Sequence, residues 1–213
     1  MIAFDDAFRR LPLIAILRGI RPHEAVDVVG ALVAEEFAVV EVPLNSPEPF
    51  ESIRRLADAY GARAVVGAGT VLGETDARRA IDAGSRILVA PNLEPAVGRV
   101  AAAAGIAWSP GIATPTEAFR ALDLGAACVK RFPAEMIPPA AVKAMRAVLP
   151  GATRLVPVGG IGTDTMAAYV SAGAAGFGLG SSLYRPGDAP DRVRDAAARL
   201  RTAYRAAAGA SVG

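Results

Sequence analysis

Cysteine is almost absent from this chain of 213 residues, which contains only Cys128. An internal disulfide is therefore impossible, and the composition is compatible with a reducing compartment. Aromatic residues make up only 6% of the chain, and no basic run stands out. Nucleic-acid-binding surfaces need clustered cations and usually stacking aromatic rings. We therefore expect no nucleic-acid partner, and the net charge of +2 fits arginines scattered over a solvated exterior.

Long apolar runs are also missing. The first run, Leu11 to Leu17, stops at Arg18 and is far shorter than the roughly 20 residues that span a bilayer. Asp5 and Asp6 place acidic charge where a signal peptide needs basic charge. We expect a soluble cytoplasmic protein without a membrane partner.

The chain does contain a repeated pattern of a short apolar run, small residues, an alanine-rich amphipathic stretch and a glycine. The spacing predicts helices between strands. The expected strands are Leu13–Leu17, Ala38–Pro43, Ala64–Gly67, Ile87–Ala90, Ala107–Pro110, Cys128–Phe132, Leu155–Val158 and Gly176–Leu179. Thr114-Pro115-Thr116-Glu117 reads as a capping box, and Ser46-Pro47-Glu48 as a helix start with an N-cap serine.

Alternating strands and helices predict a parallel sheet. Eight such units without a linker indicate one domain over residues 1–213, folded as a closed (β/α)8 TIM barrel. A short helix should precede Leu11, and the tail after Gly209 should be disordered. A doubly wound open sheet is the alternative.

Lys130 is the first candidate for chemistry, because it lies inside the apolar segment Ala127–Pro133. Barrel enzymes carry their chemistry at the C-terminal ends of the strands, where Lys130 falls. A buried ammonium is costly, so burial lowers the pKa of a lysine and yields a neutral amine able to attack a ketone. The alternative is that Lys130 points outward and Arg131 inward. Lys143, the other lysine, lies in an exposed-looking helical segment.

Glu41 lies near the end of the second expected strand, between Val40 and Val42. A carboxylate among β-branched residues indicates a functional interior, where it can shuttle protons. The alternative is a structural ion-pair partner for Lys130 or Arg18.

Two glycine-rich loops give the clearest ligand signal. Gly159-Gly160 follows the seventh strand, and Gly178-Leu179-Gly180-Ser181-Ser182 ends the eighth. Barrels often bind phosphate with these two loops, because glycines let backbone N–H groups approach the anion. Tight turns are the alternative interpretation.

The remaining special residues are interpreted as structural. Gly67-Ala68-Gly69-Thr70 lacks the third glycine and the acidic residue of a dinucleotide loop. His23 has no nucleophile partner motif, and Cys128 and Trp108 fit core positions. No cluster has metal-ligand spacing, so we expect neither a metal nor another cofactor.

Several motifs together resemble the family of 2-keto-3-deoxy-6-phosphogluconate and 2-dehydro-3-deoxy-6-phosphogalactonate aldolases, from Leu11 to about Tyr204. The motifs are Ile16-Leu17-Arg18-Gly19, Glu41-Val42-Pro43-Leu44-Asn45-Ser46, Gly67-Ala68-Gly69-Thr70-Val71, Pro91-Asn92, Ser109-Pro110-Gly111, Lys130-Arg131-Phe132-Pro133-Ala134-Glu135, Pro157-Val158-Gly159-Gly160-Ile161 and Gly180-Ser181.

The resemblance implies a metal-free class I aldolase, an aldehyde-lyase that is usually a homotrimer and acts on a phosphorylated keto-deoxy sugar acid. It implies that Lys130 forms a Schiff base and Glu41 is the acid/base. It also implies that Arg18 and Thr70 bind the keto-acid end. The phosphate would then be held by Gly160, Gly180 and Ser181.

Two positions separate the branches of this family. Gluconate enzymes usually carry arginine where this chain has Asn45 and threonine where it has Val158, whereas galactonate enzymes are similar to this chain at both. The resemblance thus favours the galactonate substrate, with Val158 in the binding site and Arg18 as its main cation. The alternatives are a gluconate aldolase, a non-covalent phosphate-binding isomerase or synthase, and a non-catalytic sugar-phosphate-binding protein.

Overall fold

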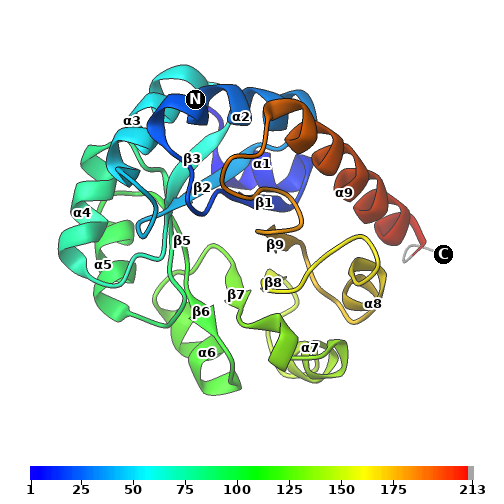
Figure 1. The fold of residues 1–213 in the computed structure, drawn as a ribbon. Coiled ribbons are helices and arrows are strands. Elements are labelled where there is room, and N and C mark those ends of the chain that lie inside the picture. The colour runs from blue at the N-terminus through cyan, green and yellow to red at the C-terminus, as the bar shows by residue number, and fades with distance from the viewer. Residues whose placement is uncertain (211–213) are drawn as a thin grey trace.

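The computed structural model describes residues 1–210 (Figure 1). The strands are β1 (Leu13–Ile16), β2 (Val39–Pro43), β3 (Val65–Gly69), β4 (Ile87–Val89), β5 (Ala107–Ser109), β6 (Gly111–Ile112), β7 (Val129–Arg131), β8 (Leu155–Pro157) and β9 (Phe177–Leu179). The helices are α1 (Phe4–Arg10), α2 (Pro22–Ala34), α3 (Pro49–Tyr60), α4 (Glu74–Asp82), α5 (Pro95–Ala103), α6 (Pro115–Asp123), α7 (Pro139–Arg146), α8 (Met166–Ser171) and α9 (Pro190–Ala210), with a 3-10 turn η1 (Ala134–Met136).

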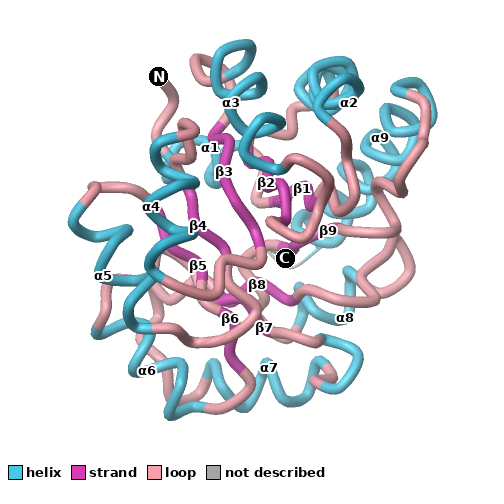
Figure 2. Tube along the Cα trace, turned by 60° about the vertical axis from the view of Figure 1, so that its left-hand side comes forward, coloured by secondary structure: helices cyan, strands magenta, loops and turns pink. Residues whose placement is uncertain are grey.

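The strands form two parallel sheets, and the prediction of a closed eight-stranded barrel was wrong. A curled six-stranded sheet has the order β5-β4-β3-β2-β1-β9, and a small three-stranded sheet has the order β6-β7-β8. In the large sheet, strands β1 to β5 lie side by side in the order in which they occur in the chain. In a doubly wound sheet the strand order changes direction partway across the sheet. The alternative prediction of a doubly wound open sheet is therefore wrong as well. Figure 2 shows the helices arranged around the outside of the strands.

The division between the sheets lies at Pro110. Proline has no backbone N–H and cannot donate to a sheet ladder, so the expected fifth strand ends as β5 and resumes as β6. β5 pairs with β4, whereas β6 pairs with β7, and the Pro110 carbonyl accepts a hydrogen bond from the Lys130 amide at 2.9 Å. On the other side, Val158 and Gly178 form an isolated bridge between the ends of the two sheets.

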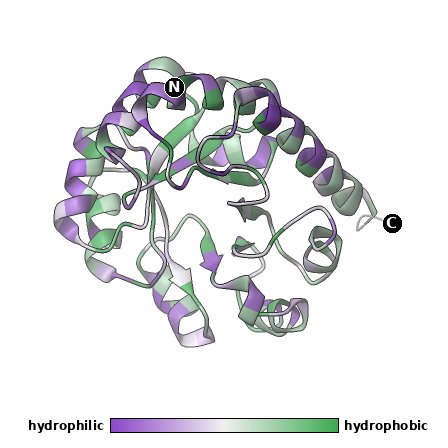
Figure 3. Cartoon of the chain, in the orientation of Figure 1, coloured by the Kyte–Doolittle hydropathy of each residue, from purple (hydrophilic) through white to green (hydrophobic). Residues whose placement is uncertain are grey.

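The strand residues alternate between two hydrophobic cores. Ile14 and Ile16 of β1 belong to an inner cluster enclosed by the strands, whereas Leu13 and Ala15 belong to the larger cluster between strands and helices. Figure 3 shows hydrophilic residues mainly on the surrounding helices. The period-two alternation therefore decides which side chains can reach the interior.

The expected N-terminal helix is α1, which covers one end of the inner cluster. Phe4 and Phe8 belong to that cluster, and the Arg154 guanidinium lies 5.9 Å and 5.4 Å from the centroids of their rings. Arg154 also donates to Asp5 at 2.6 Å. Because Arg154 directly precedes β8, α1 lies at the N-terminal ends of the strands and leaves their C-terminal ends free for a site.

Polar contacts fix the helix starts near the site. Thr114 and Glu117 form the expected capping box, with the Glu117 amide donating to Thr114 Oγ1 at 3.3 Å. The expected N-cap Ser46 is not a cap, since α3 begins at Pro49 and Ser46 Oγ instead accepts a hydrogen bond from the Gly19 amide at 2.9 Å. This bond joins the loops that follow β1 and β2.

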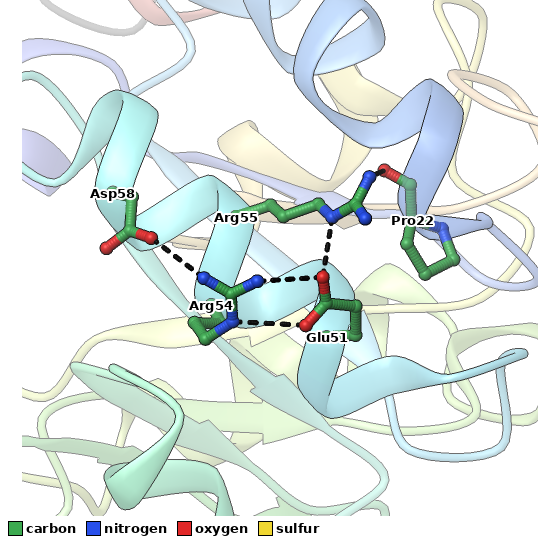
Figure 4. Close-up of polar contacts among 5 residues, drawn as sticks. All are labelled: Pro22, Glu51, Arg54, Arg55 and Asp58. Carbon is green, nitrogen blue, oxygen red and sulfur yellow. Dashed lines mark hydrogen bonds and ion pairs between the residues drawn. The ribbon is translucent and has the colours of Figure 1, made fainter.

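An ion cluster on α3 also reaches the start of α2 (Figure 4). Glu51 accepts hydrogen bonds from Arg54 and Arg55, Arg54 pairs with Asp58, and Arg55 Nη1 donates to the Pro22 carbonyl at 3.3 Å. The contact ties α3 to the helix that follows the Arg18 loop.

The end of the chain continues α9 through Gly209 and Ala210. The rest of the tail expected to be disordered, residues 211–213, lies outside the described residues. Within the described part of the chain, no helix is both long and apolar enough to cross a membrane.

Tyr169 of α8 supports η1, the turn that follows β7. Its hydroxyl lies 3.0 Å from the Ala134 carbonyl and 3.1 Å from the Ile137 carbonyl, and these contacts are buried.

We predict that Tyr169→Phe lowers the free energy of unfolding by about 1–2 kcal/mol, because buried carbonyls lose their donor. Chemical denaturation measures the change. Tyr204→Phe is the matched control, since that ring makes an edge contact with Phe177 and its hydroxyl makes no hydrogen bond recorded within residues 1–210. Equal stability of the Tyr169 variant and the wild type would contradict this role.

Candidate active site

Lys130 is buried on β7, with 5% of its surface exposed. Cys128, two residues earlier, belongs to the inner cluster, so alternation turns Lys130 to the same side. Burial lowers the pKa of Lys130, the negative charge of Glu41 opposes that shift, and the positive charge of Arg18 adds to it. Its Nζ lies 4.8 Å from the centroid of the Phe132 ring.

Arg131 is buried as well. The alternative prediction, that Lys130 points outward and Arg131 inward, is therefore wrong for this strand. Arg131 is 2% exposed, and its Nη1 donates to the Ala113 carbonyl at 2.8 Å. Burial lowers the pKa of Arg131, and the negative charge of Glu117 opposes that shift. β7 therefore buries two cations, one on each face.

Glu41 projects from β2 toward the same interior and is 1% exposed. Burial raises its pKa to about 7, against the opposing effects of the Lys130 and Arg18 charges. Its Oε2 has no hydrogen-bond partner among the described residues. A buried oxygen without a partner is uncommon, and such groups are often functional.

Gly69 makes room for this carboxylate. β2 and β3 pair in parallel, with Glu41 beside Gly67 and Pro43 beside Gly69. A Cβ atom placed on Gly69 would overlap the Glu41 carboxylate, and one on Gly67 would overlap the Ile87 carbonyl. Gly69 thus makes room for the buried acid, and Gly67 allows close packing against β4.

Thr70 follows β3 in a left-handed conformation with φ of 56°. This region is unfavourable for a β-branched residue and costs roughly 1–3 kcal/mol, and such strained residues cluster at functional sites. Thr70 is half-buried and directly follows the glycine that contacts Glu41.

A cavity of about 360 Å³ opens beside the buried pair. Its lining includes the predicted binding residues Arg18, Val158, Gly160, Gly180 and Ser181. Lys130, Glu41 and Thr70 are not part of the lining, but Phe132 is, and its ring contacts Lys130. The structure therefore brings the predicted phosphate loops and Arg18 to one cavity, with the lysine and the acid deeper in the interior.

The two glycine loops meet because Val158 bridges to Gly178. Gly159 and Gly160 have φ of 110° and 62°, which only glycine adopts easily. No helix begins directly at either loop within the described residues: α8 begins at Met166, and the Leu183 and Tyr184 amides donate to the Gly180 carbonyl.

Arg18 lies at the exposed edge of this cavity. Its Nη1 donates to Asn45 Oδ1 at 2.7 Å, so the Asn45 side chain holds Arg18 in place. Its charge acts on both Glu41 and Lys130. Arg18 therefore belongs to the Lys130 end of the cavity.

Sequence reasoning missed three residues that also line the cavity, the segment Tyr184, Arg185 and Pro186 before α9. Their only signal was a position shortly after Gly180-Ser181, since none of them lies on a strand. Arg18 is therefore not the sole cation of the cavity. Glu135 of η1 lines the cavity too; it ends the motif that begins at Lys130, but the sequence assigned it no role.

Residues interpreted as structural have structural contacts. The Trp108 ring packs on α5, where a Cβ on Gly98 would press against it. The buried Cys128 thiol donates to Ser109 Oγ at 3.2 Å, and burial raises its pKa to about 11. Over residues 1–210, no three His, Cys, Asp or Glu side chains are grouped so as to hold a metal ion.

Comparisons with known proteins agree with this arrangement. A family model described as KDPG and KHG aldolase matches residues 4–192. The chain is 48% identical to the probable 2-dehydro-3-deoxy-6-phosphogalactonate aldolase of Rhizobium meliloti, over 93% of each chain. It is 46% identical to the 2-dehydro-3-deoxy-6-phosphogalactonate aldolase of Escherichia coli, over 93% of this chain and 97% of that one.

A solved structure described as native KDPGal has a TM-score of 0.92 and 45% identity, covering 94% of this chain and 97% of the other. The family match spans most of the chain and includes the strands that carry Lys130 and Glu41. This chain belongs to the KDPG and KHG aldolase family.

Proposed function

We propose that this protein is a class I aldolase that cleaves 2-dehydro-3-deoxy-6-phospho-D-galactonate to pyruvate and D-glyceraldehyde 3-phosphate. The observation that carries the proposal is Lys130, a 5% exposed lysine whose pKa is influenced by the negative charge of the buried Glu41. The names of the Rhizobium meliloti and Escherichia coli relatives support the substrate.

Lys130 supplies the nucleophile. Because burial lowers its pKa, a larger fraction of the amine is neutral near pH 7 than for an exposed lysine. The amine attacks the C2 ketone of the substrate, and loss of water from the carbinolamine gives an iminium ion.

Glu41 moves the protons. With a pKa raised to about 7, it can both accept and donate protons near neutral pH. Its carboxylate takes the C4 hydroxyl proton while the C3–C4 bond breaks, and the electrons of that bond pass to the iminium, giving an enamine. Glyceraldehyde 3-phosphate leaves, and protonation at C3 followed by hydrolysis releases pyruvate and the free amine.

The binding residues divide between the two ends of the substrate. Arg18 and Thr70 bind the keto-acid end, in keeping with the effect of the Arg18 charge on Lys130 and the position of Thr70 beside Gly69. Gly160, Gly180 and Ser181 hold the phosphate, supported by their shared cavity. The family resemblance further supports a single-domain homotrimer in the cytoplasm.

The alternatives differ at Lys130. A non-covalent isomerase or synthase would keep the glycine loops and use Lys130 only as a charge, and a binding protein would not turn over. A gluconate aldolase would share the chemistry and differ at Val158 and Asn45.

Trapping of the covalent intermediate tests the proposal directly. Pyruvate with borohydride should add a stable mass to the peptide that contains Lys130, since reduction fixes the iminium as a secondary amine. Lys143, the chain's other lysine, is exposed and provides the internal control. Lys130→Ala should lose both label and turnover while remaining folded. A label on Lys143, or on neither lysine, would refute the Schiff-base mechanism.

Replacement of the acid tests the proton transfer. Glu41→Gln should lower kcat by about 10²–10⁴-fold, the usual contribution of a positioned acid/base group. In the wild type, the ionised carboxylate accepts the proton, so kcat should fall as the pH drops below about 7. That acidic limb should vanish in the variant. An unchanged pH profile would show that Glu41 only pairs with Lys130.

Exchange at Val158 tests the choice of substrate. Val158 is 7% exposed and lines the cavity, so it presents an apolar wall that cannot bond a hydroxyl. The galactonate and gluconate substrates differ at C4, and an apolar wall discriminates weakly. The wild type should prefer the galactonate modestly, and Val158→Thr should move the kcat/KM ratio toward the gluconate. A wild type that clearly favours the gluconate would overturn the substrate assignment but not the aldolase assignment.

A further inference from the structure

The segment between β9 and α9, residues 180–189, brings a second arginine to the substrate cavity. It is the orange trace that joins β9 to α9 in Figure 1. Arg185 lines the cavity together with Gly160, Gly180 and Ser181, and its Nε donates to the Ser181 carbonyl at 3.4 Å. The guanidinium therefore lies beside the glycine loops and not beside Lys130.

The segment is anchored on α2 and on the loop that carries Arg18. Tyr184 is 3% exposed, and its hydroxyl donates to Glu24 of α2 at 3.2 Å. Pro186 packs on Gly19, where a Cβ atom would press against the proline ring. Arg185 lies between these two anchors, so its backbone position is defined on both sides.

A third contact fixes the backbone of Arg185 itself. Its amide donates to Asp188 Oδ2 at 2.7 Å, and the same carboxylate oxygen lies 3.1 Å from Arg192 Nη1. Asp188 is thus engaged by the amide and by Arg192, and no ion pair is recorded between Asp188 and the Arg185 guanidinium among the described residues. The guanidinium retains N–H groups for a ligand.

The charges of the cavity are arranged along its length. Arg18, Arg185 and Glu135 are the charged residues of its lining. Arg18 acts on Lys130 and Glu41, whereas Arg185 contacts Ser181. Glu135 lies against Gly159 and Gly160, where it would repel an anion. A phosphate on the glycine loops therefore needs a nearby cation, and Arg185 is placed to supply it.

We propose that Arg185 is a phosphate-binding residue that makes this site select phosphorylated over unphosphorylated sugar acids. The inference rests on the proposed aldolase function and adds a specificity-determining residue to it. A guanidinium offers two parallel N–H groups to phosphate oxygens, a stronger and more directional contact than a neutral hydrogen bond. Arg18 then serves the carboxylate end and Arg185 the phosphate end.

The test compares kcat/KM for the phosphorylated and unphosphorylated sugar acids in the wild type and in Arg185→Gln. The variant should lose about 10- to 100-fold on the phosphorylated substrate, mainly through KM, and change little on the unphosphorylated one. Inhibition by inorganic phosphate should weaken in parallel. Arg185→Lys should be intermediate, because it keeps the charge but not the paired donors. Arg194→Gln is the matched control, since that exposed arginine of α9 pairs with Asp191 and does not line the cavity.

Two outcomes would overturn the proposal. One is an unchanged preference for the phosphorylated substrate in Arg185→Gln, and the other is an equal loss on both substrates, which would reduce Arg185 to a loop-positioning residue. Pyruvate labelling with borohydride needs no phosphate and should persist in the variant, which also shows that the variant is folded. If the wild type itself forms no pyruvate adduct, the aldolase function fails instead, so the two failures are distinguishable.

Discussion

The site depends on the burial of two opposite charges on strands of different sheets, Glu41 on β2 and Lys130 on β7. Moving an ammonium or a carboxylate out of water costs several kcal/mol, and their attraction offsets this cost only in part. For Lys130 and Glu41, burial is the largest influence on the pKa of each group, and the attraction between them opposes it. Burial thus shifts the two pKa values toward neutrality from opposite sides, as a nucleophilic amine and a proton shuttle require.

The surrounding structure accommodates this pair. Gly69 leaves space for the Glu41 carboxylate, and the Asn45 side chain and the Ser46 hydroxyl hold the Arg18 loop. Helix α1 packs at the N-terminal ends of the strands, so the cavity opens at the other end, where the glycine loops meet through Val158 and Gly178. Fold and site are linked because the same strand alternation separates the outer core from the reactive interior.

Much of this could be predicted from the sequence because its signals are local. An apolar strand that contains Lys130 predicts a buried amine, and alternation places it with Cys128. The sequence could not show that Arg131 is also buried, because its side chain bonds the carbonyl of Ala113, which follows the neighbouring strand β6. The division of the sheet at Pro110 was missed because it too depends on contacts between strands. β5 and β6 are adjacent in the chain, but β5 pairs with β4 and β6 pairs with β7. Arg185 was missed, and Glu135 was given no role, because the contacts that bring turn residues to a cavity leave no periodic pattern.

The most direct test of the central claim is a measurement of the pKa of Lys130. The pH dependence of its modification by an amine-specific reagent gives this value. Lys143 is labelled in the same sample and calibrates the reagent. The account predicts a Lys130 pKa below the ordinary lysine value of about 10.4, and a further decrease in Glu41→Gln, because that variant removes the negative charge that raises it. A Lys130 pKa at or above the ordinary value, or an increase in the Glu41 variant, would contradict the account.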